Sequence, residues 1–323
     1  MQSAFERELA QNRRKYLVRL KLQGLRQIFV IMGIVFMLIF SYIPMVGIII
    51  AFKDYKLATG FTGFFTSKWA GFSNFIEFFH DRNFGVMMRN TIVLSLLKLV
   101  FTFPLPIIFA IAINEIRNSK AKKIVQTISY LPHFISWVIV AGLIFSFLNG
   151  STGLINQFLM NLGVIHKSIP FLSNPKYFWP IAVISDMWKG MGWWAIIFMA
   201  AITGVDVEIY EAAIVDGASR IQRINHITLP SIKSTIVIVL IMSLGNLLGG
   251  GMGGSNFDQC YLLGNSLNSK YSEIIETYVL TMGLAQGRYS YAAAVGLFQS
   301  IISLVLIYSS NFMSEKLFDV GLF

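Results

Sequence analysis

The sequence predicts an all-α membrane protein with six transmembrane helices, and three observations lead to this fold class. Hydrophobic residues make up 55% of the 323 residues and charged residues 13%, about half of the roughly 25% found in soluble domains. The apolar residues gather in runs long enough for a helix to cross a membrane, which takes about 20 residues. Lys and Arg cluster just outside these runs. The spans must be helices, because no open sheet edge survives in lipid.

Six apolar runs are the predicted spans, and in chain order they are 28–52, 91–113, 124–147, 177–203, 234–250 and 291–313. Four of the runs contain no charged residue, and one of these four is the short fifth run, which ends in glycines. The second run contains Lys98 alone, and the fourth contains Asp186 and Lys189. Together the runs predict a six-span domain that covers residues 28–323.

Basic residues predict the orientation, with both termini in the cytoplasm. In that orientation the inner segments hold 15 Lys and Arg and the outer loops hold eight, and an excess of these residues is typical of cytoplasmic loops. The formal charge of +10 therefore indicates a membrane partner and not nucleic acid. Residues 1–27 form a predicted basic cytoplasmic leader, which either lies as an amphipathic helix on the anionic inner leaflet or only sets the topology.

Residues 204–233 form a polar loop on the predicted cytoplasmic side, and its centre reads EAAIVDGASRIQRINHITLP. A first helix is expected to start at Asp206 as N-cap, with acidic residues in its first turn, where the helix dipole favours negative charge. Gly217 then permits a turn that a Cβ would hinder. A second short helix follows, and Pro230 is expected to bend the chain into the fifth span.

The spacing in this loop resembles the EAA loop of permease subunits in bacterial binding-protein-dependent ABC importers. The resemblance implies a set of residues that couple the subunit to an ATPase, namely Glu211, Ala212, Ala213, Asp216, Gly217, Arg220, Ile227, Leu229 and Pro230. Other stretches, such as ISYLPHFISWVIVAGLIFSFL and ITLPSIKSTIVIVLI, are similar to sugar permeases of the maltose-type group. Within that group they resemble the branch that imports complex oligosaccharides, including uronate-rich alginate or pectin fragments.

The resemblance implies a type I importer fold in the bacterial cytoplasmic (inner) membrane, working by alternating access. It also implies a second homologous permease subunit, two ATPase subunits and an extracellular or periplasmic sugar-binding protein. The sequence contains no G-x-x-x-x-G-K-[ST] phosphate-binding loop, so ATP and Mg would be bound by the ATPase subunits. We expect no cofactor, metal or enzymatic activity in this chain itself.

A secondary transporter and an integral-membrane enzyme are the two alternatives to an importer subunit. A stand-alone ion-coupled secondary transporter would work without nucleotide and usually carries an inverted repeat, which is not visible in this sequence. An integral-membrane enzyme would need catalytic groups that converge near one interface. The four histidines are scattered without the spacing of metal ligands, and no acidic pair combines with a nucleophile.

The fourth span holds the first candidate for a substrate path. Asp186 and Lys189 lie one helical turn apart and can pair, and charges inside spans normally face a bundle interior or a water-filled cavity. With Trp188, Trp193 and Trp194 they predict a path for sugars, whose apolar faces stack on aromatic rings. The alternative is an interfacial belt of tryptophans with the ion pair packed against a partner subunit.

A second candidate, Asn256, Asp258 and Gln259, lies at the outer end of the broken fifth span. These polar side chains either contact sugar or the binding protein, or are simply solvated in an outer loop. The glycines of residues 249–254 are expected to break this helix close to the outer leaflet, because each glycine lowers helix stability by about 1 kcal/mol. The broken stretch is then either a flexible gate or an exit loop. Lys98 in the second span either snorkels or pairs with another subunit.

Overall fold

The computed structural model describes residues 23–24 and 26–322, and the regular secondary structure of this part of the chain is helical. Within it, one isolated β-bridge joins Lys53 and Trp69. The predicted leader, residues 1–27, lies largely outside the described residues. In chain order the helices after the first long one are α3 (Gly63–Thr66), α4 (Ser73–Phe79), α5 (Phe84–Phe101), α6 (Pro104–Asn114), α7 (Ser119–Tyr130), α8 (Trp137–Leu148), α9 (Leu154–Asn161), α10 (Phe178–Thr203), α11 (Val207–Val215), α12 (Arg220–Arg223), α13 (Leu229–Ser231), α14 (Lys233–Gly245), α15 (Asn256–Leu263), α16 (Ser269–Ser272), α17 (Ile275–Leu280) and α18 (Tyr289–Phe318).

Among the described residues, three helices are long and apolar enough to cross a membrane: Arg26–Phe52, Phe84–Asn114 and Tyr289–Phe318. Three further pairs of helices are each bent at a short break, so the spans number up to six if every pair counts as one. The first, second and last predicted spans therefore lie in continuous helices. The count of six and the cytoplasmic position of both termini stay predictions.

The third predicted span, 124–147, is not one straight helix. A short 3-10 turn, Leu131–Phe134, separates α7 from α8, and the two parts meet at 97°. Pro132 stands at the start of this turn, and the hydroxyl of Ser136 caps α8 by accepting the Ile139 N–H at 3.4 Å. Apolar composition alone shows no sign of the bend, because hydropathy is the same whichever way a helix points.

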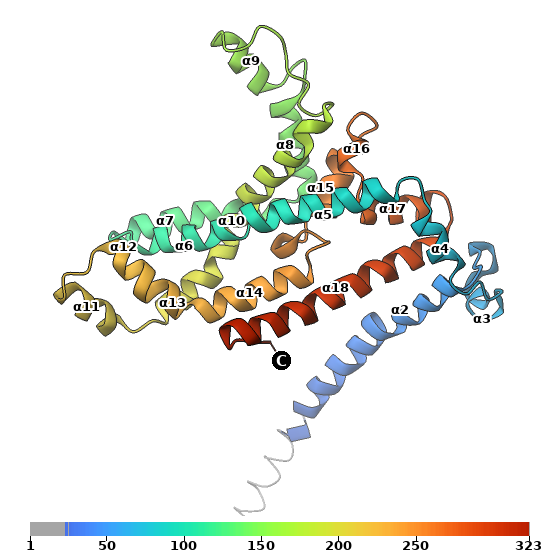
Figure 1. Cartoon of the computed structure of the whole chain (residues 1–323), viewed down its shortest axis with the longest axis horizontal. Helices are drawn as coiled ribbons and strands as arrows, with labels where there is room; N and C mark the ends of the chain where they lie inside the picture. Colours follow the sequence, from blue (N-terminus) through green and yellow to red (C-terminus); the bar gives the residue numbers. More distant parts are fainter. Residues whose placement is uncertain (1–22, 25, 323) are drawn as a thin grey trace, which may run out of the picture.

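α5, α6, α14 and α18 run in roughly the same direction, whereas α8 and α9 project away from them (Figure 1). α10 packs against α6, and α14 packs against α18. α11 and α12 lie at one end of the bundle, whereas α4 and α17 lie at the opposite end (Figure 1). Because the loop with α11 and α12 is the predicted cytoplasmic one, the end with α4 and α17 is the predicted outer end.

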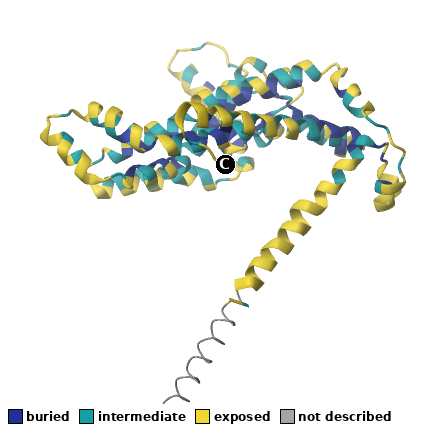
Figure 2. Ribbon diagram, turned by 60° about the horizontal axis from the view of Figure 1, so that its bottom comes forward, coloured by how far each residue is buried: buried dark blue, intermediate teal, exposed yellow. Residues whose placement is uncertain are grey.

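The first helix, Arg26–Phe52, projects away from the rest of the chain (Figure 2). Only 6% of its most apolar stretch is buried by the other described residues. The core lies instead where α5, α10 and α15 meet, where α6, α10 and α14 meet, and at the outer end around Phe78 and Tyr291. The first helix therefore contributes to the bundle mainly through its last turns, which pack against α18 and bury Ala51.

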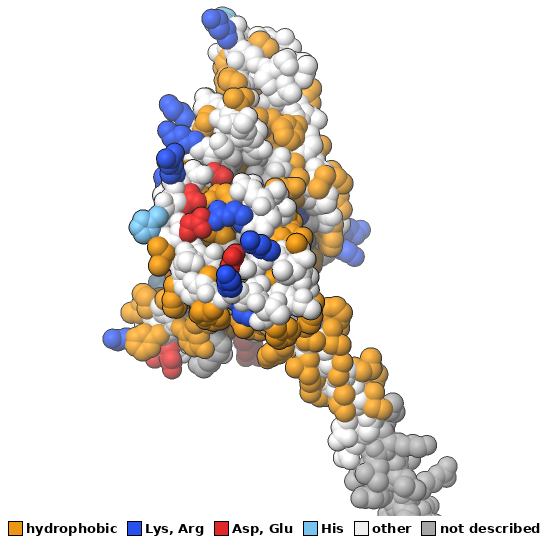
Figure 3. Space-filling model, turned by 90° about the vertical axis from the view of Figure 1, so that its right-hand side faces the viewer, with side chains coloured by type: hydrophobic (Ala, Val, Ile, Leu, Met, Phe, Trp, Pro, Cys, Tyr) orange, Lys and Arg blue, Asp and Glu red, His pale blue; other side chains and the backbone are white. Residues whose placement is uncertain are grey.

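Acidic and basic side chains lie close together on the surface of the outer end (Figure 3). The Asp81 carboxylate accepts hydrogen bonds from the hydroxyls of Tyr278 and, at 3.0 Å, Tyr291. Arg288 pairs with Glu77 at 2.6 Å. Burial alone would raise the pKa of Asp81, but the bond from Tyr278, the backbone N–H of Asn83, the Tyr291 hydroxyl and the Arg288 charge outweigh it and hold that pKa below its usual value. The ionised carboxylate thus ties the segment before α5 to α17 and α18.

Candidate functional site

The polar loop forms the helix-turn-helix that the sequence predicts. Asp206 is the N-cap of α11, and its carboxylate accepts the Glu208 N–H at 3.0 Å. α11 ends at a turn in which Gly217 has φ +80°, a conformation that costs other residues energy. In this turn the Gly217 N–H donates to the Ile214 carbonyl at 3.0 Å. The predicted cap and turn are confirmed.

The second half of the loop begins with a capping box at Ser219. The Gln222 side chain accepts the Ser219 N–H at 2.7 Å, and the Ser219 hydroxyl accepts the Gln222 N–H at 3.4 Å. α12 then continues through a π-helical turn, Ile224–Thr228, into α13, which contains Pro230. The chain bends by 61° between this unit and α14. The bend predicted at Pro230 therefore lies at the end of α13.

The two halves of the loop are fastened to each other. The hydroxyl of Tyr210 on α11 hydrogen-bonds that of Thr228 at 2.9 Å, and Thr228 is buried. Between the two halves lies a cleft of about 460 Å³, lined by Ala213, Asp216, Gly217, Ala218, Gln222, Arg223, His226 and Ile227. Five of the residues implied by the EAA resemblance, Glu211, Ala212, Asp216, Gly217 and Arg220, are exposed, as is Pro230. Ala213, Ile227 and Leu229 are half-buried in the loop.

Asp186 and Lys189 do not pair with each other, so the predicted ion pair is wrong. Asp186 is buried and accepts a hydrogen bond of 2.5 Å from the Ser255 hydroxyl. Lys189 turns the other way and donates to the His133 carbonyl at 2.7 Å. His133 lies in the break of the third predicted span, so Lys189 satisfies a carbonyl that the interrupted helix leaves without an intrahelical partner.

Aromatic rings surround Lys189. Its ammonium lies 5.5 Å from the centre of the Trp137 ring. Trp193, one turn further along α10, stacks on His133 with ring centres 4.4 Å apart and planes 2° apart. Phe134 meets the Trp193 ring edge-on at 5.6 Å. A half-buried ammonium, an imidazole and indole rings thus come together where α10 faces the bend between α7 and α8.

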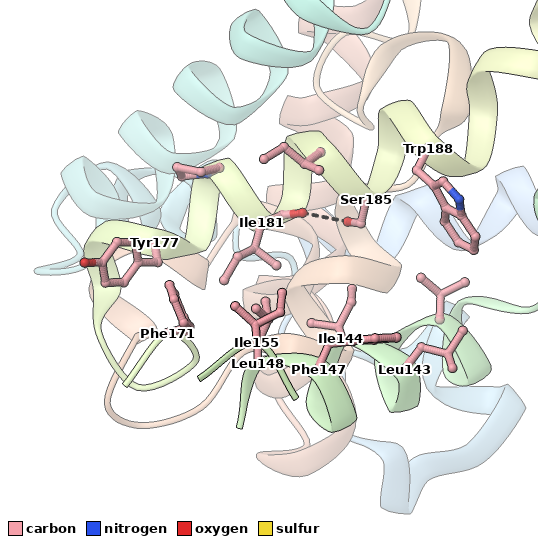
Figure 4. Close-up of a pocket in the computed structure, with 13 residues that line it drawn as sticks. Leu143, Ile144, Phe147, Leu148, Ile155, Phe171, Tyr177, Ile181, Ser185 and Trp188 are labelled. Atoms are coloured by element: carbon pink, nitrogen blue, oxygen red, sulfur yellow. Dashed lines mark hydrogen bonds between the residues drawn. The ribbon is translucent and has the colours of Figure 1, made fainter. Parts of the chain in front are cut away.

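Trp188 and Trp194 do not belong to this cluster. Trp188 lines an apolar pocket of about 470 Å³ between α8 and α10, together with Phe147 and Ile181 (Figure 4). The Ser185 hydroxyl at this pocket is turned back to the Ile181 carbonyl at 2.8 Å. Trp194 packs over Gly190 on its own helix. The pocket beside Trp188 therefore offers apolar contacts and no free polar group for a sugar hydroxyl.

The polar residues that follow the glycines are mostly enclosed. Asn256 donates to the Ser95 hydroxyl at 2.9 Å, and Gln259 donates to the Ala182 carbonyl at 2.7 Å. Both side chains are fully buried, whereas Asp258 between them is half-buried. Asn256 and Gln259 consequently hold α15 to α5 and α10 in this structure, and a contact of either with sugar stays a prediction.

Lys98 does not snorkel toward the membrane surface, and its ammonium has a hydrogen-bond partner within this chain. Its side chain is 2% exposed, and its ammonium donates to the Ser255 hydroxyl at 2.7 Å. Lys98 is residue 15 of the 31 in the helix Phe84–Asn114, so the contact lies near the middle of that span. The residue that follows the glycine break, Ser255, therefore contacts the helix Phe84–Asn114 near its middle. A position of the break close to the outer leaflet stays a prediction.

Comparison with known proteins identifies the family. Residues 102–318 match the family described as binding-protein-dependent transport system inner membrane component. The chain belongs to this family. A family member of this kind is a membrane component of an ABC importer, which accounts for the apolar helices and for the polar loop between them.

Two curated relatives come from Bacillus subtilis (strain 168). Protein LplB is 45% identical over 291 residues, which cover 90% of this chain and 88% of LplB. The polygalacturonan/rhamnogalacturonan transport system permease protein YteP is 41% identical over 313 residues, covering 97% and 94%. A crystal structure of a bacterial ABC transporter involved in the import of the acidic polysaccharide alginate has a chain with TM-score 0.83 and 38% identity. That match covers 92% of this chain and 97% of the other and shows a type I ABC importer permease fold.

The permease chain thus separates residues that helical spacing groups together. Lys189 and Trp193 lie together, with His133 added, while Asp186 belongs to a different cluster with Lys98 and Ser255. Sequence reasoning missed Ser255 and His133. His133 follows a proline within an apolar run, which is the one local sign of a break there. Ser255 has no comparable signal, because its partners are distant in sequence.

Proposed function

We propose that this chain is the transmembrane subunit of an ATP-driven importer of oligosaccharides, coupled to partner ATPase subunits through the loop 204–233. Family membership and the names of the relatives support the importer. The observation that carries the coupling is the loop itself: a compact, exposed helix-turn-helix between two helices of the bundle. In the predicted orientation it is available to a partner on the cytoplasmic side.

The loop exposes apolar side chains that a solvated hairpin would not need. The exposed apolar residues of the loop are Val207, Ile209, Ile214, Val215 and Ile221. Val215 is 87% exposed and Ile221 is 71% exposed, one on each side of the Gly217 turn. Contiguous exposed apolar surface rimmed by polar residues marks a protein-interaction site. This tip is the surface that we assign to the ATPase subunit.

The other subunits of the proposed importer are separate chains. Two ATPase subunits on the cytoplasmic side bind ATP and Mg, and a second homologous permease in the bacterial inner membrane completes the path. An extracellular or periplasmic sugar-binding protein delivers solute at the outer end. Alternating access follows if the ATPase subunits displace the loop and thereby the helices on either side of it. A stand-alone secondary transporter is the alternative, and it would move solute without nucleotide.

Replacing Val215 with Asp is expected to release the ATPase subunits while the permease stays folded. The side chain is almost fully exposed, so the change affects the stability of this chain by no more than about 0.5 kcal/mol. A charge in the centre of an apolar contact, by contrast, must be desolvated on binding. Copurification of the ATPase with the tagged permease measures the effect, and we expect a loss of at least roughly tenfold in bound ATPase.

Val164→Asp is the matched control, because Val164 is 65% exposed in the segment between α9 and α10, at a distance from the loop in sequence and in the fold. This variant should retain the ATPase. Undiminished ATPase binding by Val215→Asp, with transport intact, would contradict the proposed coupling surface.

The solute that fits best is an oligosaccharide that carries carboxylates. The relatives named for polygalacturonan/rhamnogalacturonan and for alginate transport support this class. In this chain the group formed by Lys189, Trp193 and His133 offers both requirements of such a solute: a cation for the carboxylate and ring faces for the sugar. We therefore place the substrate path along this side of α10 and leave Trp188 and Trp194 outside it.

Lys189→Met is expected to raise the KM for an acidic oligosaccharide by roughly tenfold and to change the KM for a neutral one of equal length by much less. The expected size follows from the loss of one charge-assisted hydrogen bond to solute. Uptake by vesicles containing the whole importer measures both values. Lys176→Met, in the turn before α10, is the control. Equal effects on the two solutes would show that Lys189 only braces the His133 carbonyl.

A further inference from the structure

Two ionisable side chains are enclosed in the middle of the bundle, and one hydroxyl joins them. Ser255 accepts a hydrogen bond from the Lys98 ammonium at 2.7 Å and donates one to Asp186 at 2.5 Å. The three side chains, which we call the polar relay, are 1–4% exposed. A serine hydroxyl can donate and accept at once. No hydrogen bond or ion pair joins Lys98 to Asp186 directly within the described part of the chain.

The relay fixes the end of a glycine-rich turn, residues 246–254. Three glycines of this turn, at positions 250, 251 and 254, have positive φ, so its shape depends on residues without a Cβ. The Asn246 side chain closes the turn by donating to the Gly251 carbonyl at 2.9 Å. A Cβ at position 253 would lie 3.1 Å from the Asp186 carboxylate. The turn is therefore seated closely on α10, and Ser255 is the side chain that bonds it there.

The contact between the glycine-rich turn and α10 is connected along the chain to the loop 204–233. α10 carries Asp186 and leads into the loop at Thr203, while α14 leaves the loop at Lys233 and ends at the glycine-rich turn. The two helices pack together near the loop through Phe198, Ile202 and Val239. Ser255, which follows the glycine-rich turn, is bonded to Asp186, about 18 to 24 Å back along α10 from Phe198 and Ile202 at 1.5 Å per residue. A displacement that moves α10 relative to α14 must therefore strain or break the relay.

The relay also has unused hydrogen-bonding capacity. The Lys98 ammonium has three donors, and one hydrogen bond is present. In α15, which begins directly after Ser255, the side-chain oxygens of Asn256 and Gln259 are buried without a partner among the described residues. Buried polar groups are normally satisfied, and exceptions call for an explanation. A second arrangement of the turn, in which these groups exchange partners, would provide one.

We propose that Ser255 is a positioning residue for transport: it seats the glycine-rich turn on α10 and α5 through Lys98 and Asp186, and this seat opens when nucleotide acts on the loop 204–233. The proposal rests on the proposed function for the source of the displacement. The seat itself is a property of this chain, and it can be measured without any solute.

The test places a cysteine in the turn, by Met252→Cys in a Cys260→Ala background, in the complete importer in membrane vesicles. Cys260 is the one native cysteine and is buried. Labelling by a hydrophilic maleimide reports how open the turn is. Adding Ser255→Ala should speed labelling at least roughly tenfold, because hydrogen bonds to charged groups are the strong ones. Ser243→Ala is the matched control, since that buried hydroxyl bonds only its own helix, at the Val239 carbonyl.

A second measurement needs no change in the relay. With Ser255 intact, labelling at position 252 should differ several-fold between the nucleotide-free importer and the importer held with a non-hydrolysable ATP analogue. Equal labelling in both states, or equal labelling of Ser255→Ala and Ser243→Ala, would overturn the inference. If transport by the unaltered importer needs no nucleotide, the proposed function fails instead, so the two failures are distinguishable.

Discussion

Gly217→Pro is expected to abolish nucleotide-driven uptake while the permease still accumulates in the membrane. Proline holds φ near −65°, whereas residue 217 has φ +80°. The change also removes the N–H that bonds the Ile214 carbonyl at 3.0 Å. The turn must then rebuild with a different backbone conformation, and α11 and α12 lose their relative orientation. Uptake and solute-stimulated ATPase activity in reconstituted vesicles measure the loss, with an immunoblot for the amount of permease.

A matched pair of alanine substitutions separates backbone conformation from a general sensitivity of glycines in the loop. Gly217→Ala meets no atom within 4 Å but is strained by its positive φ, so we expect partial loss of coupling. Gly204→Ala lies at the start of the same loop with φ −81° and should behave as wild type. If Gly217→Pro kept both uptake and stimulated ATPase activity, the loop would not be the coupling element.

Asp186→Leu is expected to prevent stable accumulation of the permease. It leaves the enclosed Lys98 ammonium with a hydroxyl but without the nearby negative charge. Removing one partner of a buried charge pair typically costs about 3–5 kcal/mol, which is a large part of the stability of a domain. The amount of protein in the membrane and the midpoint of thermal unfolding in detergent report the effect.

The double variant Lys98→Met with Asp186→Leu should recover most of that stability, because no isolated charge then remains in the bundle. A double variant as unstable as Asp186→Leu alone would show that the cost comes from packing and not from the uncompensated ammonium. Comparing the two variants thus shows whether the stability lost in Asp186→Leu comes from the uncompensated charge or from altered packing.

Features set by neighbouring residues were predicted well. Asp206 caps α11 and Gly217 forms the turn because each depends on the few residues beside it. The apolar runs located the long helices for the same reason. The amino-acid pattern alone therefore outlines the loop, although the role of the loop in coupling stays a proposal.

Features set by distant contacts were not predictable in the same way. Helical spacing offered Lys189 as the partner of Asp186, but the partner is Ser255, 69 residues away. The glycines indicated that the fifth helix breaks, yet the contact made just after the break is with Lys98, 157 residues away from Ser255. The 97° bend in the third run is a change in the direction of the helix axis, which apolar composition does not indicate.

The exposed first helix has a consequence for how the chain is made. Only 6% of the most apolar stretch of Arg26–Phe52 is buried by the rest of the described chain, which contacts this helix mainly at its last turns. Most of the free energy that retains this helix in the bilayer therefore comes from contact with lipid tails. Its partitioning out of the translocation channel requires nothing that is synthesised later. The first helix can therefore insert into the bilayer while the ribosome is still synthesising the bundle. The segment that is made first is thus also the one that depends least on later segments for its insertion.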